Sequence, residues 1–426
     1  MIIQNSKELA TNFRKKATLE IIETGLNAAD PKKSIRKFVK PNKIILGKKS
    51  IHLPPSKNVY VVAFGKSADS MAGSLNSILK IKNGIIVIPK GSKNQIKAKK
   101  FQVFHSGHPL PNNVSVQAAK SIMKFLDKRK KDDMVIFLVS GGGSSLVSLP
   151  DGISLNEKIA VNNLLLKSGA TIQEFNCVRK HLSKIKGGLM VKNLKCKAVS
   201  LVMSDVVNDD LSSISSGCTY YDATTFADAK KIIKKYNLYN KIPSSVKKRI
   251  EDGVIGNIDE TPKKPKIKNQ IIATNKNCLD SMAKKAKQLG YEPKTLTISG
   301  NVIAASKKVL QLLPKKKNSC LVFGGETTVK VTGKGKGGRN QEMVLRILKN
   351  SQKIRNDLVI CSVGTDGIDG NTLAAGAMIE KFSIKPNQID PFLKNNDSNS
   401  FFKKHGGLIK TGYTHTNLLD VGVILN

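Results

Sequence analysis

Short apolar segments alternate with longer amphipathic segments along almost the whole chain. The runs at 59–64 and 134–139 are continuously apolar, the run at 198–203 is interrupted only by Ser200, and all three have the length of a strand; a helical pattern at 67–80 follows the first of them. Buried parallel strands form such continuous runs, and strands alternating with helices are typical of α/β layers. The alternation resumes after residue 270 and ends in an apolar run at 421–425. We therefore predict an α/β protein.

A polar segment between residues 251 and 268 interrupts this alternation. It contains Pro262, Pro265 and several lysines, and clusters of this kind mark loops and linkers. A chain of 426 residues is also long enough for two or three domains. We expect an N-terminal domain over residues 1–255 and a C-terminal domain over residues 268–426, with the option that about the first 45 residues pack on the second domain. Residues 6–27 are expected to form one helix.

The chain is strongly basic, because 72 lysine and arginine residues oppose 31 aspartate and glutamate residues and give a net charge of +41. Such a charge attracts polyanions such as nucleic acid. However, the lysines are spread along the whole chain, arginine is scarce, and aromatic residues make up only 5% with no tryptophan, so surfaces on which bases could stack are few. We therefore expect a lysine-rich solvated surface and no specific nucleic-acid partner.

The sequence shows no sign of a membrane or an oxidising environment. No apolar run reaches the ~18 residues of a membrane span, and the N-terminus lacks the apolar core of a secretory signal. The six cysteines lie far apart and form no C-x-x-C pair, so neither a zinc site nor a disulfide framework is indicated. We expect a cytoplasmic protein without a membrane partner, as a monomer or a homodimer.

Loops with glycine or charged side chains follow directly after the predicted strands. Ligands of open α/β sheets bind at the carboxyl ends of strands, so these loops are the candidate sites. Lys66 stands in Gly-Lys-Ser between a strand and a helix, where its ammonium and the helix-terminal amides can bind a phosphate or a carboxylate. The loop is not a Walker A motif, because position 60 is tyrosine. The simpler interpretation is that Lys66 is only an exposed lysine.

A run of three glycines follows the strand at 134–139. Glycine lets the backbone approach a ligand closely, and the N–H groups of such a loop can surround a phosphate. A tight strand-to-helix turn needs fewer glycines, so phosphate binding is the favoured interpretation. The residues concerned are Ser140, Gly141, Gly142, Gly143 and Ser144.

Carboxylates occur in two further loops. Asp205 follows the apolar run at 198–203, and Asp366 and Asp369 lie in a glycine-rich loop after 358–363. Mg²⁺ prefers one or two protein carboxylates together with waters and phosphates, and a carboxylate can also accept the proton of a substrate hydroxyl. Helix capping and turn formation are the alternative explanations. Which aspartate is a base and which is a metal ligand stays open.

The segment 324–342 combines glycines with charged and polar side chains. It matches G-x-G-x-x-G at positions 333, 335 and 338, but two lysines and an arginine among the glycines suit a triphosphate better than a dinucleotide. The alternative is a solvated hairpin end. The residues expected to bind an anion here are Gly325, Glu326, Gly337, Gly338, Arg339 and Asn340.

In order along the chain, these loops resemble the type-2 glycerate kinase family, whose C-terminal part is called the MOFRL domain. The collinear resemblance covers roughly residues 20–425. It is carried by Val-Ala-Phe-Gly-Lys-Ser at 62–67, Gly-His-Pro-Leu-Pro at 107–111, the serine–glycine loop at 140–145, Asn-Cys-Val-Arg-Lys-His-Leu-Ser at 176–183, Lys-Gly-Gly at 186–188, Ser-Asp-Val at 204–206, Ser-Gly at 216–217, and the segments 324–328, 337–342 and 364–370.

The resemblance implies two α/β domains, the first a Rossmann-like three-layer sandwich and the second a smaller, mixed-sheet MOFRL-like domain, with the active site in the cleft between them. It implies transfer of the γ-phosphoryl group of ATP to D-glycerate, giving 2-phosphoglycerate, with Mg²⁺. The site lysine and arginine of the family fall on Lys66 and Arg339. We expect Lys66, Arg339, Asp205 and Asp366 to be catalytic, and Asp205, Asp366 and Asp369 to hold the metal. The glycine loops would bind ATP.

The chain departs from the family pattern at several positions. Gly217-Cys218 stands where the family has Gly-Pro. In the segment 411–420, Tyr413 and His415 replace a proline and a glycine of the family pattern, and Leu419 replaces the asparagine expected before Asp420.

Two other functions stay open at this stage. The G-x-G-x-x-G match would fit an NAD(P)H-dependent hydroxypyruvate reductase, although no histidine with a carboxylate partner suggests a hydride site. The positive charge would fit a nucleic-acid-binding protein, for which binding that survives physiological salt would be the evidence.

Overall fold

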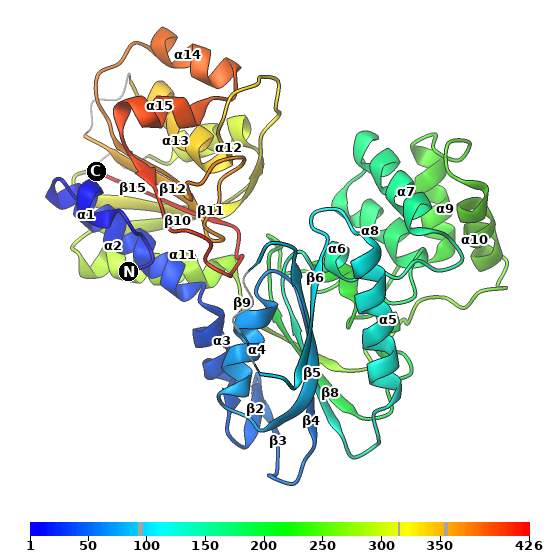
Figure 1. Ribbon diagram of the computed structural model, residues 1–426. Helices are drawn as coiled ribbons and strands as arrows, with labels where there is room; N and C mark the ends of the chain where they lie inside the picture. Colours follow the sequence, from blue (N-terminus) through cyan, green and yellow to red (C-terminus); the bar gives the residue numbers. More distant parts are fainter. Residues whose placement is uncertain (93–95, 97, 314–315, 353–356) are drawn as a thin grey trace. The chain divides into compact units, whose positions relative to one another are not determined.

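The computed structural model describes residues 1–92, 96, 98–313, 316–352 and 357–426 (Figure 1). The chain divides into two compact units, each with its own sheet. We call the unit formed by Pro31–Ser204 and Asn208–Ile272 the parallel-sheet unit. The unit formed by Met1–Asp30, Asp205–Val207 and Ala273–Asn426 is the mixed-sheet unit.

The parallel-sheet unit is built on a six-stranded sheet in the order β6-β5-β4-β7-β8-β9. Neighbouring strands from β6 to β8 are parallel, and β4 pairs with β7 from Val59↔Met134 to Phe64↔Val139. Every residue of β4 and β7 is buried, which explains their unbroken apolar sequence. Because neighbouring parallel strands end at the same edge, their carboxyl-terminal loops meet there.

The elements of this unit follow the predicted alternation. In chain order they are α3 (Pro31–Phe38), β1 (Val39–Lys40), β2 (Lys43–Leu46), β3 (Lys49–His52), β4 (Val59–Phe64), α4 (Ala68–Asn76), β5 (Ile81–Pro89), β6 (Phe101–Ser106), α5 (Asn113–Asp127), β7 (Met134–Val139), α6 (Gly143–Leu146), α7 (Leu155–Lys167), α8 (Ile172–His181), η1 (Leu189–Val191), β8 (Lys197–Met203), η2 (Ile214–Gly217), α9 (Phe226–Lys235), α10 (Ser244–Val254) and β9 (Lys268–Ala273). Strands β1 to β3 form a separate small antiparallel sheet.

Helices α7 to α10 enclose a second apolar core in this unit, to which Val161, Val178, Phe226 and Val246 contribute. Capping boxes begin α7 at Ser154 and α8 at Thr171, where each side chain accepts the N–H of the glutamate three residues later. These caps fix where α8 starts and therefore which of its side chains face the strand ends.

The mixed-sheet unit has the strand order β10-β11-β15-β12-β13-β14. Its elements are α1 (Ser6–Leu9), α2 (Phe13–Ala28), α11 (Asn275–Gln288), β10 (Glu292–Asn301), α12 (Val302–Gln311), β11 (Ser319–Thr328), α13 (Arg339–Asn350), β12 (Val359–Gly364), β13 (Gly376–Glu380), α14 (Pro386–Lys394), α15 (Ser398–His405), β14 (Leu408–Ile409) and β15 (Asp420–Leu425). Strands β10 and β11 are parallel, whereas the C-terminal strand β15 runs antiparallel between β11 and β12. The main core of the unit includes Phe323, Leu345, Ile360, Phe401 and Ile424.

The fold class predicted from the sequence is confirmed, with one parallel and one mixed α/β sheet, but several boundaries differ. The expected helix at 6–27 is two helices, α1 and α2, and α2 packs on α11 and β15 of the mixed-sheet unit. Strand β9 follows the proline-containing segment yet forms the edge of the parallel sheet, so the division falls one strand later than residue 268. Residues 319–328 form the single strand β11.

Among the described residues, none of the helices combines the length and the apolar character needed to cross a membrane.

Candidate active site

Lys66 and the glycine loop at 140–145 lie side by side at the carboxyl ends of β4 and β7. The backbone N–H of Lys66 donates to the carbonyl oxygen of Gly141 at 2.8 Å. The N–H of Ser67 donates to Oγ of Ser140 at 3.0 Å. The two loops that the sequence singled out separately therefore form one continuous surface, which has glycine backbone on one side and an ammonium group on the other.

Two glycines are required by the geometry of this surface. Gly65 has a φ of +128° and passes so close to the backbone of Ser140 that a side chain would overlap it. Gly142 has a φ of +84°, and a Cβ there would lie 3.0 Å from the ring of His108 and 3.4 Å from Cγ of Lys66. His108 and the stem of Lys66 thus border Gly142 directly. The missing side chains leave backbone exposed where a phosphate could approach.

A strained turn at Ser215 and Ser216 makes hydrogen bonds to the glycine loop. Ser215 and Ser216 both lie in the left-handed backbone region, with φ of 50° and 55°. Oγ of Ser215 donates to the carbonyl oxygen of Ser140 at 3.1 Å, and Oγ of Ser216 lies 2.8 Å from Oγ of Ser144. Residues other than glycine rarely adopt this conformation, and such strain concentrates at functional sites. Of this turn, the sequence indicated only the Ser-Gly motif at 216–217.

Two polar atoms at this end of the parallel-sheet unit are buried and have no partner within the described chain. They are Oγ of Ser67 and Nε of Arg179. Buried polar atoms are nearly always hydrogen-bonded, so two orphans here indicate that a ligand completes the site. A hydroxyl and a guanidinium N–H suit phosphate oxygens, as does the glycine backbone beside Lys66, and the residues present therefore fit the triphosphate of ATP.

Asp205 follows β8 and is half-buried, and the segment Asp205–Val207 groups with the mixed-sheet unit. Its neighbour Asp210 has a structural role, because its carboxylate accepts hydrogen bonds from Ser212 and Ser213. In this loop Asp210 therefore stabilises a turn, and Asp205 stays the candidate metal ligand.

In the mixed-sheet unit, Asp420 is the centre of the polar cluster. It begins β15 and pairs with Gly325 of β11 and Gly364 of β12. Nε of Arg339 lies 2.6 Å from Oδ2 of Asp420, and Nη1 of Arg339 lies 3.0 Å from Oε1 of Glu326. Arg339 is thus held by two carboxylates. Asp420 is not among the predicted site residues; its sequence signals are its place in the family segment 411–420 and at the start of an apolar strand.

Burial raises the pKa of Asp420 to about 7, against the opposing effects of Arg339 and Asn340. Burial alone would lower the pKa of Arg339, but Asp420 and Glu326 raise it above its ordinary value. Asn340 also supports this ion pair, because its Nδ2 donates to Oδ1 of Asp420 at 3.0 Å while its Oδ1 accepts from Ser362 at 2.6 Å. The polar atoms of Asn340 are therefore used within the protein, although we expected it to bind the cofactor.

Asp369 caps α13. Its two carboxylate oxygens accept the backbone N–H groups of Asn340 and Gln341, both at 2.9 Å, and the side-chain amides of the same two residues at 3.2 and 3.0 Å. Each oxygen thus accepts two hydrogen bonds, which fills the lone-pair sites of a carboxylate. The sequence suggested a metal ligand at Asp369, but the structure leaves it no lone pair for a metal. A carboxylate at a helix N-terminus is the physical reason for its position.

The G-x-G-x-x-G segment does not present its N–H groups to a ligand. The N–H of Gly333 donates to the side chain of Asn396 at 2.9 Å, and that of Gly335 donates to the carbonyl oxygen of Asn395 at 2.9 Å. The N–H of Gly337 donates to Asn371 at 3.0 Å. The segment also follows β11 without the strand–turn–helix geometry of a dinucleotide site, because 329–338 has no regular structure before α13. Gly337 and Gly338 were expected to bind a cofactor; instead, a side chain at Gly338 would overlap Asp369.

No group of three or more histidine, cysteine, aspartate or glutamate side chains suited to a metal occurs within the described ranges. Mg²⁺ bound to a nucleotide needs fewer protein ligands, because it keeps several waters and takes phosphate oxygens with one or two carboxylates. Asp205 and Asp366 fit this requirement, since each is half-buried and each follows the end of a strand. Oδ1 of Asp366 also accepts the N–H of Ile368 at 3.3 Å.

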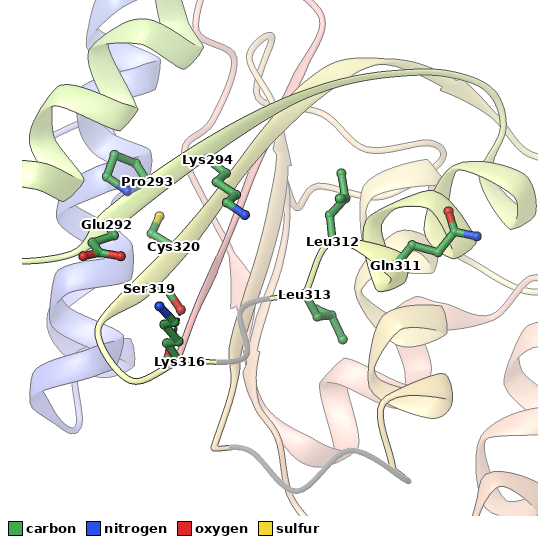
Figure 2. A pocket seen from close by; sticks show the side chains of 9 residues that line it. All are labelled: Glu292, Pro293, Lys294, Gln311, Leu312, Leu313, Lys316, Ser319 and Cys320. Atoms are coloured by element: carbon green, nitrogen blue, oxygen red, sulfur yellow. Dashed lines mark hydrogen bonds between the residues drawn. The ribbon is translucent and has the colours of Figure 1, made fainter.

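A surface pocket of about 620 Å³ in the mixed-sheet unit lies elsewhere (Figure 2). Its lining comes from the beginnings of β10 and β11, at Glu292, Lys294 and Cys320, and from the end of α12 at Leu312. Because β10 and β11 are parallel, this pocket is at the opposite end of these strands from Glu326. Ligands of α/β sheets bind at the carboxyl ends, so this pocket is not the candidate active site.

Both parts of the chain match known families. Residues 17–251 match the family described as a domain of unknown function, DUF4147, and residues 319–420 match the MOFRL family. The chain is 37% identical to a glycerate 2-kinase of Pyrococcus horikoshii, with 96% of each chain covered. It is 36% identical to a D-glycerate 2-kinase of Thermotoga maritima, over 96% of this chain and 98% of the relative.

The fold is similar as well. A crystal structure titled glycerate kinase from Thermotoga maritima superimposes with a TM-score of 0.80 at 34% identity, covering 95% of this chain and 97% of the other. Together, the parallel-sheet unit, the mixed-sheet unit and their polar strand ends define a two-domain α/β kinase. The chain belongs to the glycerate 2-kinase family.

Proposed function

We propose that this chain transfers the γ-phosphoryl group of ATP to the 2-hydroxyl of D-glycerate, giving 2-phosphoglycerate and ADP, with Mg²⁺. The observation that carries the proposal is similarity along nearly the whole chain to proteins named glycerate 2-kinase. The paired loops at the ends of β4 and β7 support it, because phosphoryl transfer needs mainly positioning and neutralisation of charge.

The glycine loop and Lys66 would act on the phosphates. Glycine backbone at Gly142 permits close approach, and Lys66 borders it with a positive charge. Ser140 and Ser144 supply hydroxyls on either side of the three glycines. Lys66 would stabilise negative charge on the transferring group, which is the kind of contact whose loss costs roughly 10²–10³ in rate.

Arg339 would hold the carboxylate of D-glycerate. It makes three hydrogen-bonded contacts, to Glu326 and to both oxygens of Asp420, and a guanidinium has five N–H donors, so two remain for a substrate. Gly325 and Glu326, from the same strand end, orient the guanidinium in this proposal. That Lys66 and Arg339 act on one bound substrate stays a prediction from the sequence.

Asp205 and Asp366 would hold Mg²⁺, or one of them would accept the proton of the substrate hydroxyl. When bound, Mg²⁺ supplies Lewis-acid neutralisation of the phosphate oxygens. Asp369 has no part in this proposal, because its carboxylate caps α13.

The test is a coupled assay with ATP, Mg²⁺ and D-glycerate, followed by phosphorus NMR of the product. We expect ADP release that depends on D-glycerate and a product with the phosphate on the 2-oxygen. Exclusive formation of 3-phosphoglycerate would overturn the regiochemistry. Absence of ADP release with D-glycerate and with other small hydroxy acids would overturn the kinase.

The reductase alternative loses its motif, because N–H groups of the G-x-G-x-x-G segment are bonded to Asn371, Asn395 and Asn396. Titration with NADH should therefore show no saturable binding. We also propose a cytoplasmic enzyme that is a monomer or a homodimer and has no specific nucleic-acid partner; size-exclusion chromatography with light scattering tests the oligomeric state.

A further inference from the structure

Three basic side chains lie close together beneath the Ser144 end of the glycine loop. Lys158 on α7 is 1% exposed and Lys186, after α8, is fully buried. Arg179 on α8 is half-buried, with an Nε that is buried and has no partner. Throughout the described ranges, none of the three has an aspartate or glutamate within ion-pair distance. Burying an ion without a counter-ion costs several kcal/mol, so the arrangement needs an explanation.

The adjacent Lys180 shows how a buried lysine is usually stabilised, by an ion pair with a buried carboxylate. It is also buried, at 4% exposure, but its Nζ lies 3.2 Å from Oδ1 of the fully buried Asp222. One turn of the same helix thus carries a paired lysine and an arginine without a carboxylate partner. The contrast indicates that the negative charge opposite Arg179 is not supplied by the described chain.

Both lysines donate hydrogen bonds to the segment that begins with the glycine loop, at Ser144 and Ser148. Nζ of Lys186 donates to the carbonyl oxygen of Ser144 at 3.0 Å, and Nζ of Lys158 donates to Oγ of Ser148 at 3.0 Å. Each ammonium therefore has one hydrogen bond to the protein, although it can donate three. The guanidinium carbon of Arg179 lies 4.8 Å from the ring centre of Phe175, within the range of a cation–π contact.

A short chain of hydroxyl groups runs along the same surface. Oγ of Ser144 lies 2.8 Å from Oγ of Ser216, which donates to Oδ1 of Asn176 at 3.2 Å. Ser216 is held in its left-handed conformation because its carbonyl oxygen accepts the N–H of Gly187 at 3.1 Å. The strained turn therefore places the hydroxyl of Ser216 against Ser144, whose carbonyl oxygen accepts from Lys186.

The burial and mutual proximity of these cations shift the pKa values of both lysines. Burial, together with the charges of Arg179 and Lys180 and against the opposing effect of Cys218, lowers the pKa of Lys186 to about 8. Burial, with Lys186 and Arg179 nearby, lowers the pKa of Lys158 well below its ordinary value. The ligand-free site is therefore destabilised by like charges, and an anion with more than one negative charge would relieve this repulsion.

We propose that Arg179, Ser144 and Ser216 form a binding subsite for a phosphoryl group, with Lys186 and Lys158 as positioning residues behind it. This deepens the proposed function and rests on it. Arg179 would contact the phosphoryl oxygens through its Nε and its terminal nitrogens. Lys186 would act through the Ser144 carbonyl that it holds. A phosphoryl group has several acceptor oxygens and up to two negative charges, which matches this set better than a single carboxylate does.

The phosphoryl group has two possible sources, the polyphosphate of ATP and the phosphate of the product. Thermal unfolding distinguishes them when the protein is titrated with ATP, tripolyphosphate, inorganic phosphate, 2-phosphoglycerate and D-glycerate. Ligands that bind the folded protein raise the unfolding midpoint with concentration. The variants are Arg179→Met and Lys186→Met, with Lys180→Met as the matched control because that lysine is paired.

We expect Arg179→Met and Lys186→Met to unfold at the same temperature as the unaltered protein or higher when no ligand is present, because each removes an unpaired charge. Their apparent affinity for the stabilising phosphoryl compound should fall roughly 10- to 100-fold. Lys180→Met should unfold at a lower temperature, because Asp222 is left alone, but keep the phosphoryl response. In kinetics, Lys186→Met should raise the KM of the nucleotide more than it lowers kcat if ATP is the source.

Arg179→Lys, which keeps the charge, should recover part of the response. Stabilisation by ATP and tripolyphosphate but not by 2-phosphoglycerate assigns the subsite to the nucleotide, and the reverse assigns it to the product. The proposal is overturned if Arg179→Met and Lys186→Met are destabilised like Lys180→Met and respond normally, or if D-glycerate alone gives the Lys186-dependent shift. It is also overturned if no phosphoryl compound stabilises the unaltered protein, and the coupled assay then decides separately whether the chain is a kinase.

Discussion

Arg339 is bound on two sides by carboxylates, and this determines what its removal does. Its side chain is 31% exposed, whereas that of Asp420 is only 6% exposed. Removing the guanidinium leaves the carboxylate of Asp420 buried, with Asn340 as its remaining side-chain donor among the described residues. Lys66, by contrast, borders glycine backbone and is half-buried. Lys66 and Arg339, which are both proposed to neutralise charge in the active site, therefore differ in how much each contributes to the stability of the fold.

We predict that Lys66→Ala lowers kcat at least about 100-fold with little change in the unfolding midpoint. Arg339→Ala should lower activity similarly and also lower the free energy of unfolding, by up to about 3 kcal/mol, because a buried carboxylate loses its partner. Steady-state kinetics and chemical denaturation measure both. As a control, Asp420→Asn added to Arg339→Ala should recover part of the stability but not the activity. Normal turnover in either single variant would show that the proposed cations are not those of the active site.

The lowered pKa of Lys186 makes the free energy of unfolding depend on pH, and it also fixes the sign of that dependence. The pKa is about 8 in the folded protein and near 10.5 when the chain is unfolded. Between these values the unfolded state binds more protons, so stability rises with pH in that window, while below pH 8 the full penalty is present. The charged and titratable groups that act on it are Lys158, Arg179, Lys180 and Cys218.

We therefore expect Lys186→Met to exceed the unaltered protein in stability most clearly below pH 8, with the difference shrinking toward pH 10.5. Denaturation curves at a series of pH values test this, and taking the difference between the two proteins cancels the titration of the other lysines. A difference that is constant across pH 7–10.5 would contradict it.

At the scale of elements, α13 begins where Asp369 accepts its first N–H groups. Asp369→Asn replaces an acceptor with a donor facing those groups, so the free energy of unfolding should fall by about 1–3 kcal/mol. The Mg²⁺ concentration that gives half-maximal activity should not change. Asp366→Asn is the matched variant from the same loop, and it should raise that Mg²⁺ concentration with little loss of stability. If the two variants exchange these effects, Asp369 is the ligand after all.

The loop before β15 carries a departure from the family pattern that has a physical cost. His415 has a φ of 57°, and its Nδ1 is buried without a partner in the described chain. A residue with a side chain pays roughly 1–2 kcal/mol for the left-handed conformation, which glycine adopts freely. His415→Gly, which restores the family residue, should therefore raise the free energy of unfolding by about 1 kcal/mol. Leu419→Asn, which also restores a family residue, should have the opposite effect on stability.

Leu419 also has a positive φ, of 65°, but it is only 2% exposed. Leu419→Asn should therefore lose stability, because the lost burial outweighs the relieved backbone. Denaturation of both single variants tests the pair, and a loss of stability in His415→Gly would contradict the argument.

At the scale of the whole molecule, the net charge of +41 should produce weak binding to any polyanion. Binding through dispersed lysines depends on counterion release, so it should fall steeply with salt and show no preference for sequence. Titration of labelled duplexes and single strands at low and at physiological salt tests this. Submicromolar affinity at physiological salt, or a preference for one sequence, would overturn the expectation.

The local sequence was sufficient for most elements and for one half of the candidate site. The apolar runs of β4 and β7 identify buried parallel strands, and parallel strands in register bring their following loops together, so Lys66 and the glycine loop could be expected to meet. The sequence also predicted that the glycine loop, to which Gly142 belongs, serves close approach of the backbone. These inferences depend on periodicity and on residues within a few positions of one another.

The other half of the candidate site depends on contacts between residues that are far apart in the chain. The insertion of β15 between β11 and β12 brings Asp420 to Arg339, and the carboxylate of Asp369 reaches the start of α13. In the loop that resembled a dinucleotide site, the N–H of Gly333 donates to the side-chain oxygen of Asn396. A lysine pattern likewise does not reveal that Lys180 has a buried carboxylate partner, whereas Lys186 has no carboxylate partner among the described residues. Local propensity fixes which segments become strands and helices, whereas burial and long-range pairing fix which charges meet. The sequence alone therefore determined the α/β layers and the candidate loops, and only the tertiary structure decided which of their charged groups are paired.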